Sequence, residues 1–454
     1  MPHIRRLDHQ PDLLALHEAN AARYPFLLQS VAHGPRQARY DILFALPSET
    51  LRLDPSRGLT GPHTRPDHSD FLQALDTWWQ QESPSNTNAQ TSVPDWPFQG
   101  GWFLYLGYEL AGQIEPSLSL PAVDDGLPTA FATRVRAALM IDHESGEAVL
   151  LAEQEDDLEA LQRDCAALPP SVTSPLQLAG QLEEDDPQRY LDGVQRVKRY
   201  IVDGDVFQVN LSRTWRGRLA HPQPPAAIYR RLREQNPAPF AGLAVFEGAA
   251  VISSSPERLV RVSGREVETR PIAGTRPRTE DATQDAALQA ELLAHPKERA
   301  EHIMLIDLER NDLGRVCEPG TVRVDELMAL ESYAHVHHIV SNVRGRLRAG
   351  VTPGQVIRAV FPGGTITGCP KVRCMAIIAE LEAEGRGAYT GAMGYLNGDG
   401  SLDLNILIRT ITQQGDKLSL RAGAGIVADS IPEKELEETR AKARGLLLAL
   451  GLPE

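Results

Sequence analysis

Short apolar runs predict several β-strands in the first third of the chain, and a helical stretch is mixed with them in residues 1–80. Apolar runs at 24–30 (YPFLLQS) and 39–47 (RYDILFALP) have the length and composition of core strands. An aromatic, strand-like run follows at 100–110. Residues 132–153 hold two apolar runs on either side of HESGE, a pattern that predicts a hairpin.

Apolar positions at helical spacing predict helices in the part of the chain that follows residue 185. The first begins at Asp186 and Pro187, residue types that favour a helix start, and ends at Gly204. Two more are expected at 297–316 and 434–451. The apolar stripe of the first helix consists of Tyr190, Val194, Val197 and Ile201.

The strand expected at 204–215 has one polar and one apolar face, because alternate residues of a strand point to opposite sides. The polar face either meets solvent or lines a cleft, and the pattern alone favours solvent. Gln208, Asn210 and Ser212 form the polar face, and Phe207, Val209 and Leu211 the apolar one.

Two of the expected helices carry spaced carboxylates. Glu298 and Glu301 lie three residues apart on one helix face. Glu435, Glu438 and Lys442 form one stripe on the last helix. Such stripes are usually solvated faces, so the spacing by itself does not identify a metal site.

The histidines and cysteines do not indicate a zinc site. In the strand expected at 333–345, His335 and His337 share one face and His338 lies on the other. The four cysteines are too scattered for a zinc site or a disulfide framework: Cys165, Cys317, Cys369 and Cys374.

A polar, acidic stretch divides the chain. Residues 153–187 are rich in acidic residues, Pro and Ser, with weak periodicity. We therefore expect an N-terminal region over 1–150, a linker over 151–184 and a second region over 185–450.

The most unusual stretch is FPGGTITGCPK at 361–371. Its glycines permit sharp turns and close approach of a ligand to the backbone. Pro370 can open the helix that follows, and free N–H groups at a helix start suit an anion. The alternative is a turn that only connects two elements.

The net charge of the chain restricts the classes of molecule that it can bind. The formal net charge of -15 argues against nucleic acid or an anionic membrane as a partner. The first residues contain no apolar run long enough for a signal peptide or a membrane span, so we expect a cytoplasmic protein. A small anionic substrate would need local cations or a metal ion.

Several longer motifs resemble those of the chorismate-utilising enzymes, which include anthranilate synthase component I, aminodeoxychorismate synthase component I, and isochorismate and salicylate synthases. The match is dense from about residue 185 to 445 and thinner before residue 150. The resemblance implies an α+β fold in which two large antiparallel β-sheets pack as a sandwich with surrounding helices, with the active site in a cleft between them. The motifs are SSSPERL, RPIAGTRPR, ERAEHIMLIDLERNDLGRV, HHIVSNVRG, FPGGTITGCPKVRCM, IRT and GAGIVADSIPEKELEET.

The resemblance implies a Mg²⁺ site and a chorismate site. Glu301 and Glu438 match the family's metal ligands, with Glu298 and Glu435 beside them. Hard cations prefer such carboxylate oxygens. Arg409 matches the residue that pairs with the enolpyruvyl carboxylate. The other residues that match the chorismate site are Gly274, Thr275, Tyr389, Gly423, Ala424, Gly425 and Lys442.

Four residues match catalytic positions. Glu257 resembles the general acid that protonates the departing 4-hydroxyl group. Gln208 stands where the isochorismate and salicylate synthases have a lysine base, and an amide cannot activate water, so an ammonia-using member is implied. His338 matches the histidine beside the ring, and Thr365 the loop threonine of the amine-transferring members.

Among the two ammonia users, the resemblance is stronger to aminodeoxychorismate synthase component I, which aminates chorismate at C4. FPGGTITGCPK and NPAPF (236–240) resemble that enzyme, and LLQS (27–30) lacks the glutamate of the tryptophan-inhibited LLES motif. Ala273, however, replaces the PIKGT lysine and agrees with anthranilate synthase component I, which aminates at C2. That enzyme is the alternative.

No glutaminase signature is present, so the resemblance implies a separate glutamine amidotransferase subunit that supplies ammonia. A tryptophan site near Ser30, Tyr40 and Phe240 is left open. Two other classes remain: a non-enzymatic regulator that binds an aromatic ligand, and a hydroxylating enzyme of the isochorismate type.

Overall fold

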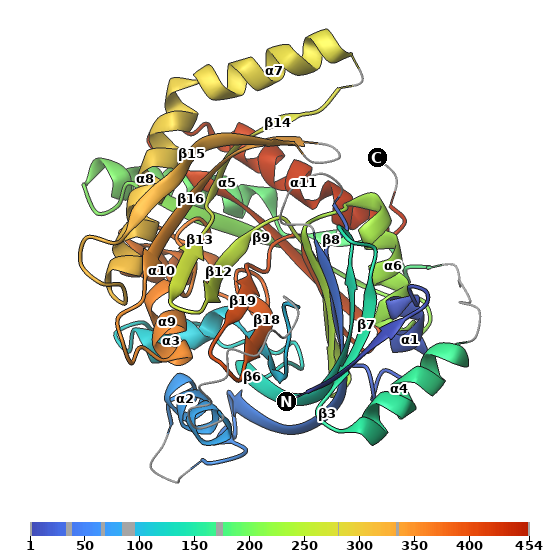
Figure 1. Cartoon of the computed structure of the whole chain (residues 1–454). Helices are drawn as coiled ribbons and strands as arrows, with labels where there is room; N and C mark the ends of the chain where they lie inside the picture. The colour runs from blue at the N-terminus through green and yellow to red at the C-terminus, as the bar shows by residue number, and fades with distance from the viewer. Residues whose placement is uncertain are drawn as a thin grey trace.

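Twenty-one strands and eleven α-helices form the described part of the chain. A computed structural model describes residues 2–32, 39–64, 69–83, 96–168, 176–279, 281–332 and 336–452. The helices cover the outside of the strands (Figure 1). They are α1 (Leu13–Ala19), α2 (Phe71–Glu82), α3 (Ala111–Ile114), α4 (Glu155–Ala166), α5 (Pro187–Val202), α6 (Pro225–Gln235), α7 (Ala282–Ala294), α8 (Pro296–Gly314), α9 (Pro353–Val360), α10 (Lys371–Glu382) and α11 (Pro432–Ala449).

All strand pairs of the described residues are antiparallel, and they join into a single hydrogen-bonded network. The strands are β1 (His3–Leu7), β2 (Phe26–Gln29), β3 (Tyr40–Asp54), β4 (Gly58–Thr60), β5 (Gly101–Leu106), β6 (Ala130–Asp142), β7 (Ala148–Ala152), β8 (Glu183–Glu184), β9 (Gln208–Arg218), β10 (Phe240–Phe246), β11 (Ala249–Ser255), β12 (Arg258–Ser263), β13 (Glu266–Thr269), β14 (Ile272–Pro277), β15 (Arg323–Ser332), β16 (Val336–Arg346), β17 (Gly368–Cys369), β18 (Ala392–Asn397), β19 (Leu402–Asn405), β20 (Thr410–Gln414) and β21 (Lys417–Ile426).

Side-chain alternation within these strands produces a layered core. In β3, Leu43 packs into one cluster with α1, α4, α6 and α11, whereas Phe44 faces an aromatic-rich inner cluster. In β5, Phe103 faces the same inner cluster, whereas Leu104 packs with α2, α8 and α9. Because both strands share the inner cluster, the continuous network encloses it between two layers with helices outside. The expected α+β architecture is therefore confirmed, although hydrogen bonds connect the two layers.

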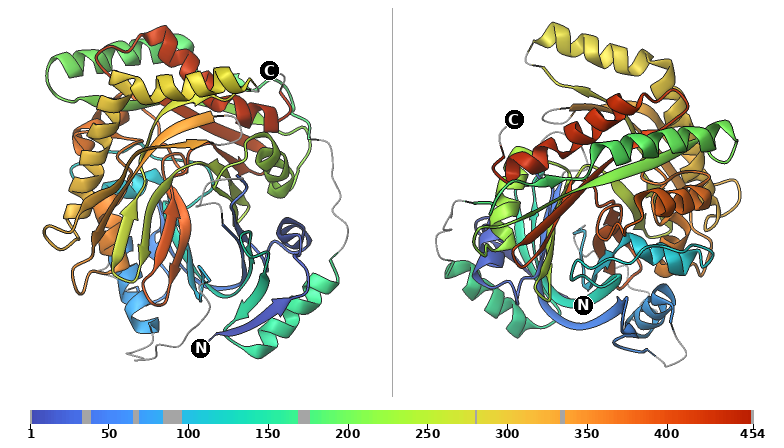
Figure 2. Two further views of the ribbon diagram at one scale, coloured as in Figure 1. Left: turned by 45° about the horizontal axis from the view of Figure 1, so that its top comes forward. Right: turned by 180° about the vertical axis from the view of Figure 1, so that it is seen from behind.

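The helix that was expected from residue 186 shows how local sequence sets its ends. The side chain of Asp186 accepts a hydrogen bond from the backbone N–H of Gln188, and Pro187 occupies the first turn. Gly204 follows the helix with a φ of +83°, a value that glycine adopts without strain. This helix, α5, packs against α11, as the view from behind shows (Figure 2).

Two elements differ from the sequence-based expectation. The strand expected from residue 204 begins only at Gln208, and Phe207, expected on its apolar face, has 67% of its surface exposed. The backbone turns at Gly204, which delays entry into the sheet. Residues 155–166, within the expected linker, form α4; its buried Leu158, Leu161 and Cys165 are few among charged neighbours, so the periodicity is weak.

The polar, proline-containing stretch at 81–99 falls partly outside the described residues, and His335 lies outside them entirely. In the part of the chain that the structure covers, every helix is too short or too polar to pass through a membrane.

Candidate active site

Glu257 lies between β11 and β12 in a buried connection. Its backbone N–H donates to Ser255 Oγ at 3.2 Å, and its carbonyl accepts from the N–H of Ile406 at 3.0 Å. The hydroxyl of Thr365 donates to Glu257 Oε1 at 2.7 Å. Burial raises the pKa of Glu257 from 4.5 to about 7, because an apolar environment disfavours the carboxylate, while the Thr365 bond acts in the opposite direction. The group can therefore hold or release a proton near neutral pH.

The glycine-rich loop brings Thr365 to Glu257. A Cβ on Gly364 would lie 2.4 Å from Leu308 Cδ2, and one on Gly368 only 2.1 Å from the carbonyl oxygen of Gln208. These contacts explain why glycine is needed at both positions. Pro370 directly precedes α10, as the sequence predicts, and Lys371 Nζ pairs with Asp312 at 2.5 Å and donates to the carbonyl oxygen of Val360 at 3.2 Å.

His338, on β16, is a neutral imidazole next to the expected chorismate residues. Its Nδ1 lies 3.2 Å from the carbonyl oxygen of Gly274. Burial, followed by the nearby Arg409 and Lys442 cations, lowers the pKa of His338 to about 4. Because a carbonyl oxygen only accepts, Nδ1 carries the hydrogen and Nε2 keeps its lone pair. The imidazole is therefore uncharged at neutral pH.

Gly274 connects this histidine to one of the expected metal-site carboxylates. It has a φ of +64° at an irregularity in the β14–β16 pairing. A Cβ at this position would lie 2.9 Å from Glu298 Oε2. Thr275 is opposite His338 in the same pairing; its side chain is outside the described part of the structure.

Charged and aromatic side chains lie close together where β21, α11 and the first residue of β20 meet. Lys442 Nζ donates to the carbonyl oxygen of Gly423 at 3.0 Å and pairs with Glu438 at 2.7 Å. Burial lowers the pKa of Arg409, and the charges of Glu438 and Glu257 act in the opposite direction, so both carboxylates lie near this guanidinium. Tyr389 is buried beside it, and a Cβ on Gly423 would be 2.8 Å from the Tyr389 hydroxyl.

Gln208 and Asn210 lie on β9, next to the glycine-rich end of β21. β9 pairs with β21 so that Asn210 is opposite Gly425 and Ser212 opposite Gly423. A Cβ on Gly425 would lie 2.2 Å from Gln208 Nε2. The two amide side chains therefore cover the last part of β21 at Gly423, Ala424 and Gly425, and the polar face of β9 is buried.

The four expected metal-site carboxylates belong to α8 and α11. Glu301 lines a cavity of about 340 Å³ with Phe207 and Asp429. Glu298 pairs with Arg276 at 3.3 Å, and Glu435 is buried. Among the described residues, no group of three or more His, Cys, Asp or Glu side chains is arranged to hold a metal. Mg²⁺ typically takes one or two carboxylates and completes its shell with substrate oxygens and water, so the donor types fit this ion.

A sequence profile of chorismate binding enzymes matches residues 25–448. The chain belongs to the chorismate binding enzyme family. Anthranilate synthase component 1 of Thermus thermophilus is 41% identical over 446 residues, which cover 96% of this chain and 94% of that protein. Aminodeoxychorismate synthase component 1 of Bacillus subtilis is 40% identical over 456 residues, covering 96% and 93%.

The fold of this chain also matches that of a solved structure. The crystal structure of anthranilate synthase component I from Streptococcus pneumoniae superposes with a TM-score of 0.78 and 31% identity, covering 91% of this chain and 93% of that one. The expected family and fold are thus confirmed. Overall identity to relatives with the two activities is nearly equal, so it does not separate C2 from C4 amination.

In this chorismate binding enzyme, the sequence did not indicate a buried ionic network beside Tyr389. Glu382 bonds to Arg386 at 2.7 Å and to Arg421 at 2.8 Å, and accepts from the Ser212 hydroxyl at 2.8 Å. Burial opposes the charge of Glu382, but the two arginines outweigh it and lower the pKa. Both guanidinium groups also approach the Tyr389 ring. The network holds Tyr389 in place.

Tyr190 was expected only as part of the apolar stripe of α5. Its hydroxyl is buried without a hydrogen-bond partner. Burial raises the Tyr190 pKa, and the charges of Glu435 and Glu438 raise it further. Tyr190 therefore stands next to two expected metal-site carboxylates, a placement that a helical periodicity cannot reveal.

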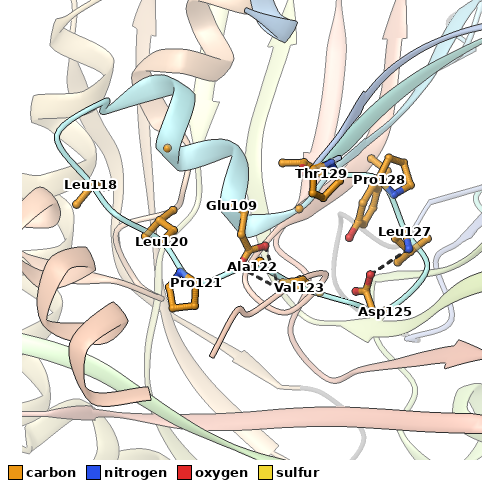
Figure 3. A pocket seen from close by; sticks show the side chains of 15 residues that line it. Glu109, Leu118, Leu120, Pro121, Ala122, Val123, Asp125, Leu127, Pro128 and Thr129 are labelled. Carbon is orange, nitrogen blue, oxygen red and sulfur yellow. Dashed lines mark hydrogen bonds between the residues drawn. The ribbon is translucent and has the colours of Figure 1, made fainter. Parts of the chain in front are cut away.

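Behind the loop that carries Tyr389 is a separate cavity of about 270 Å³ lined by two carboxyl groups (Figure 3). Glu109 accepts hydrogen bonds from the N–H groups of Arg386 at 2.7 Å and Gly387 at 3.1 Å. Asp125 accepts from the N–H of Leu127 at 3.0 Å. Burial raises the pKa of Glu109 to about 7 and that of Asp125 to about 6. These groups support the loop from outside the expected site.

The sequence leaves open whether tryptophan binds near three residues. All three line one cavity of about 820 Å³: Ser30, Tyr40 and Phe240. At its edge, Gln29 Nε2 donates to Asp41 Oδ2 and the Ser30 N–H to Asp41 Oδ1, both at 2.8 Å.

Proposed function

We propose that this protein is the chorismate-aminating component of aminodeoxychorismate synthase, forming 4-amino-4-deoxychorismate, the precursor of p-aminobenzoate and folate. The observation that carries amination is the buried amide of Gln208 at the position where the hydroxylating relatives have a basic lysine. A carboxamide cannot remove a proton from water, so water is a poor nucleophile here. Ammonia needs no such activation.

Glu257 supplies the proton that the departing 4-hydroxyl group requires. A pKa of about 7 leaves a substantial protonated fraction at neutral pH, and the bond from Thr365 fixes the orientation of the carboxyl group. After the hydroxyl leaves as water, Glu257 remains as the carboxylate. The nearby Arg409 and Lys442 charges stabilise that form.

The two carboxylates of chorismate are bound by opposite charges. Arg409 can hold the enolpyruvyl carboxylate with two parallel hydrogen bonds. Glu301 and Glu438 would hold Mg²⁺, with Glu298 and Glu435 beside them, and the ion would neutralise the ring carboxylate. Gly274, Tyr389 and the part of β21 from Gly423 to Gly425 would form the walls around the ring.

C4 amination is supported by FPGGTITGCPK and NPAPF and by Gln29 in place of the glutamate of LLES. The Gln29 amide is bonded to Asp41, so the tryptophan-inhibition motif is altered in chemistry as well as in sequence. Nitrogen would come from a glutamine amidotransferase subunit. We place this pair of proteins in the cytoplasm.

The product distinguishes the proposal from its alternative. The purified protein is incubated with chorismate, ammonium chloride and MgCl₂, with and without an aminodeoxychorismate lyase, and the products are separated by chromatography and mass spectrometry. We expect p-aminobenzoate only when the lyase is present. Fluorescent anthranilate as the main product without lyase would overturn C4 amination.

Anthranilate synthase component I is the second candidate because of Ala273 and His338. Alanine excludes the covalent lysine route at this position. Anthranilate formation needs a base to remove the C2 proton when pyruvate leaves, and the neutral imidazole of His338 beside the expected chorismate residues is a candidate for it.

A further inference from the structure

Two buried side-chain oxygens on the polar face of β9 have no hydrogen-bond partner among the described residues: Gln208 Oε1 and Asn210 Oδ1. Only 7% of the Gln208 surface and 8% of the Asn210 surface are exposed. A buried polar atom without a partner costs about 1–3 kcal/mol, so native proteins rarely keep one without a reason. The next residue on this face, Ser212, is bonded to Glu382 and needs no further partner.

The Gln208 and Asn210 side chains contact the glycine backbone of β21, beside the expected substrate residues. A Cβ on Gly425 would clash with the Gln208 amide at 2.2 Å. A Cβ on Gly423 would lie 2.8 Å from Asn210 Oδ1 and 2.8 Å from the Tyr389 hydroxyl. Asn210 and Tyr389 thus approach the same point, which places Asn210 at the wall of the chorismate site although no family motif assigned it there.

We propose that Gln208 and Asn210 together form the seat of the nucleophilic ammonia, with Asn210 as a residue that positions the nitrogen. This inference rests on the proposed amination and adds the group that binds the second substrate. The Cα atoms of residues two apart on a strand are separated by about 6.6 Å. One nitrogen that donates a bond of about 3 Å to each oxygen links oxygens no more than about 5 Å apart, so the proposal requires the ends of the two amide side chains to incline toward each other.

The chemistry of the two oxygens selects the ligand. Both are acceptors, so they repel the carboxylate oxygens of chorismate and require a donor. Ammonia can donate to both and still keep a third N–H and its lone pair. Neutral amide oxygens also bind ammonia without the strong preference for the ammonium cation that a carboxylate would impose, so the lone pair remains available.

Asn210→Leu removes the acceptor at similar volume. With ammonium chloride as nitrogen source, we expect the KM for ammonia to rise about tenfold, while the KM for chorismate changes less than twofold. Total chorismate consumption is measured, so the result does not depend on whether C2 or C4 is aminated. Gln413→Leu is the matched control: Gln413 is a buried amide in the same sheet whose oxygen also lacks a partner, but its Nε2 donates to Gln223 and Gly415 away from the site.

Asn210→Asp tests the same idea in a variant that keeps the shape of the side chain. A carboxylate there would hold the nitrogen as ammonium, so the pH profile of kcat/KM for ammonia should move to higher pH. Unchanged ammonia KM in Asn210→Leu with a raised chorismate KM would overturn the proposal and make Asn210 a contact of the organic substrate. An unmoved pH profile in Asn210→Asp would overturn it as well. If the parent protein forms no aminated product, the proposed function fails first, so the two failures are distinguishable.

Discussion

The Glu257 carboxyl group should dominate the response of the reaction to pH. Its pKa of about 7 means that the proton donor is present below that pH and is lost as the pH rises through it. We expect kcat to fall on the alkaline side at saturating ammonia. Glu257→Gln should lower kcat by at least about 10²-fold, a usual effect for a general acid, and leave the Kd for chorismate within about threefold.

Stopped-flow binding of chorismate and steady-state rates separate these two effects. Glu266→Gln, at an exposed position of β13, is the control. A Glu257→Gln rate within threefold of the parent would assign the acid to another group.

Glu109 should make the protein less stable as the pH rises. Its folded-state pKa is raised from 4.5 to about 7, so the folded state binds more protons than the unfolded state between these values. The stability due to the protonated form is present below pH 4.5 and is lost as the pH rises to about 7. Glu109→Gln should therefore gain stability relative to the parent over that window, by at most about 3 kcal/mol.

Urea unfolding at several pH values between 4.5 and 8 measures this difference. Glu234→Gln, an exposed change, should show no such trend. A difference between Glu109→Gln and the parent that stays constant across the pH range would contradict the assignment.

At the residue scale, sequence motifs predicted which residues matter but not how they contact one another. The Thr365–Glu257 bond joins positions 108 apart, and no local pattern encodes it. From the sequence, Tyr190 was predicted only as part of an apolar helix stripe, and Asn210 only as part of a polar strand face. Their unpartnered polar atoms become visible only when the neighbouring elements are in place.

At the scale of elements, α8 and α11 bring the carboxylates of the expected metal site. Glu301→Gln and Glu438→Gln should each raise the Mg²⁺ concentration needed for half-maximal rate by at least about tenfold, because each removes one charge from a hard-cation site. Titrating the rate with MgCl₂ measures this. Asp307→Asn, on an exposed part of α8, is the control, since Asp307 pairs only with Arg310 on the helix surface.

Circular dichroism should show that these variants fold. Unchanged Mg²⁺ dependence in both glutamine variants would remove the metal assignment from these two helices.

Elements with strong local signals were predicted well. The Asp186–Pro187 start of α5 and the hairpin formed by β6 and β7 are examples. Short elements that depend on distant partners were not. The start of β9 is set by the turn at Gly204, and α4 is held by three buried residues that pack on the N-terminal strands.

At the scale of the whole molecule, the isolated chain should use ammonium but not glutamine. Glutamine hydrolysis by an amidotransferase requires a cysteine thiolate, and burial raises the pKa of all four thiols here: Cys165, Cys317, Cys369 and Cys374. The measurement compares chorismate consumption with ammonium chloride and with glutamine, using protein purified without partners. Turnover with glutamine alone would contradict the need for a second subunit.

The overall arrangement followed from family resemblance, not from local pattern. β2 pairs with β10, and β5 with β18, so strands of the first 150 residues are inserted among strands of the second region. Apolar alternation shows that each strand has a buried face, but it does not show which distant strand lies beside it.

The pairing of β5 with β18 can form only after both strands have been synthesised, because they lie far apart in the sequence. The amide of Asn397 donates to the carbonyl oxygen of Pro97, 300 positions earlier, at the end of this strand pair. At about 5–20 residues per second, the later strand leaves the ribosome about 15–60 s after the earlier one. During that interval the edge of β5 lacks its native neighbour and can pair with other chains. The native neighbour of β5 is therefore available only once the last third of the chain is being translated.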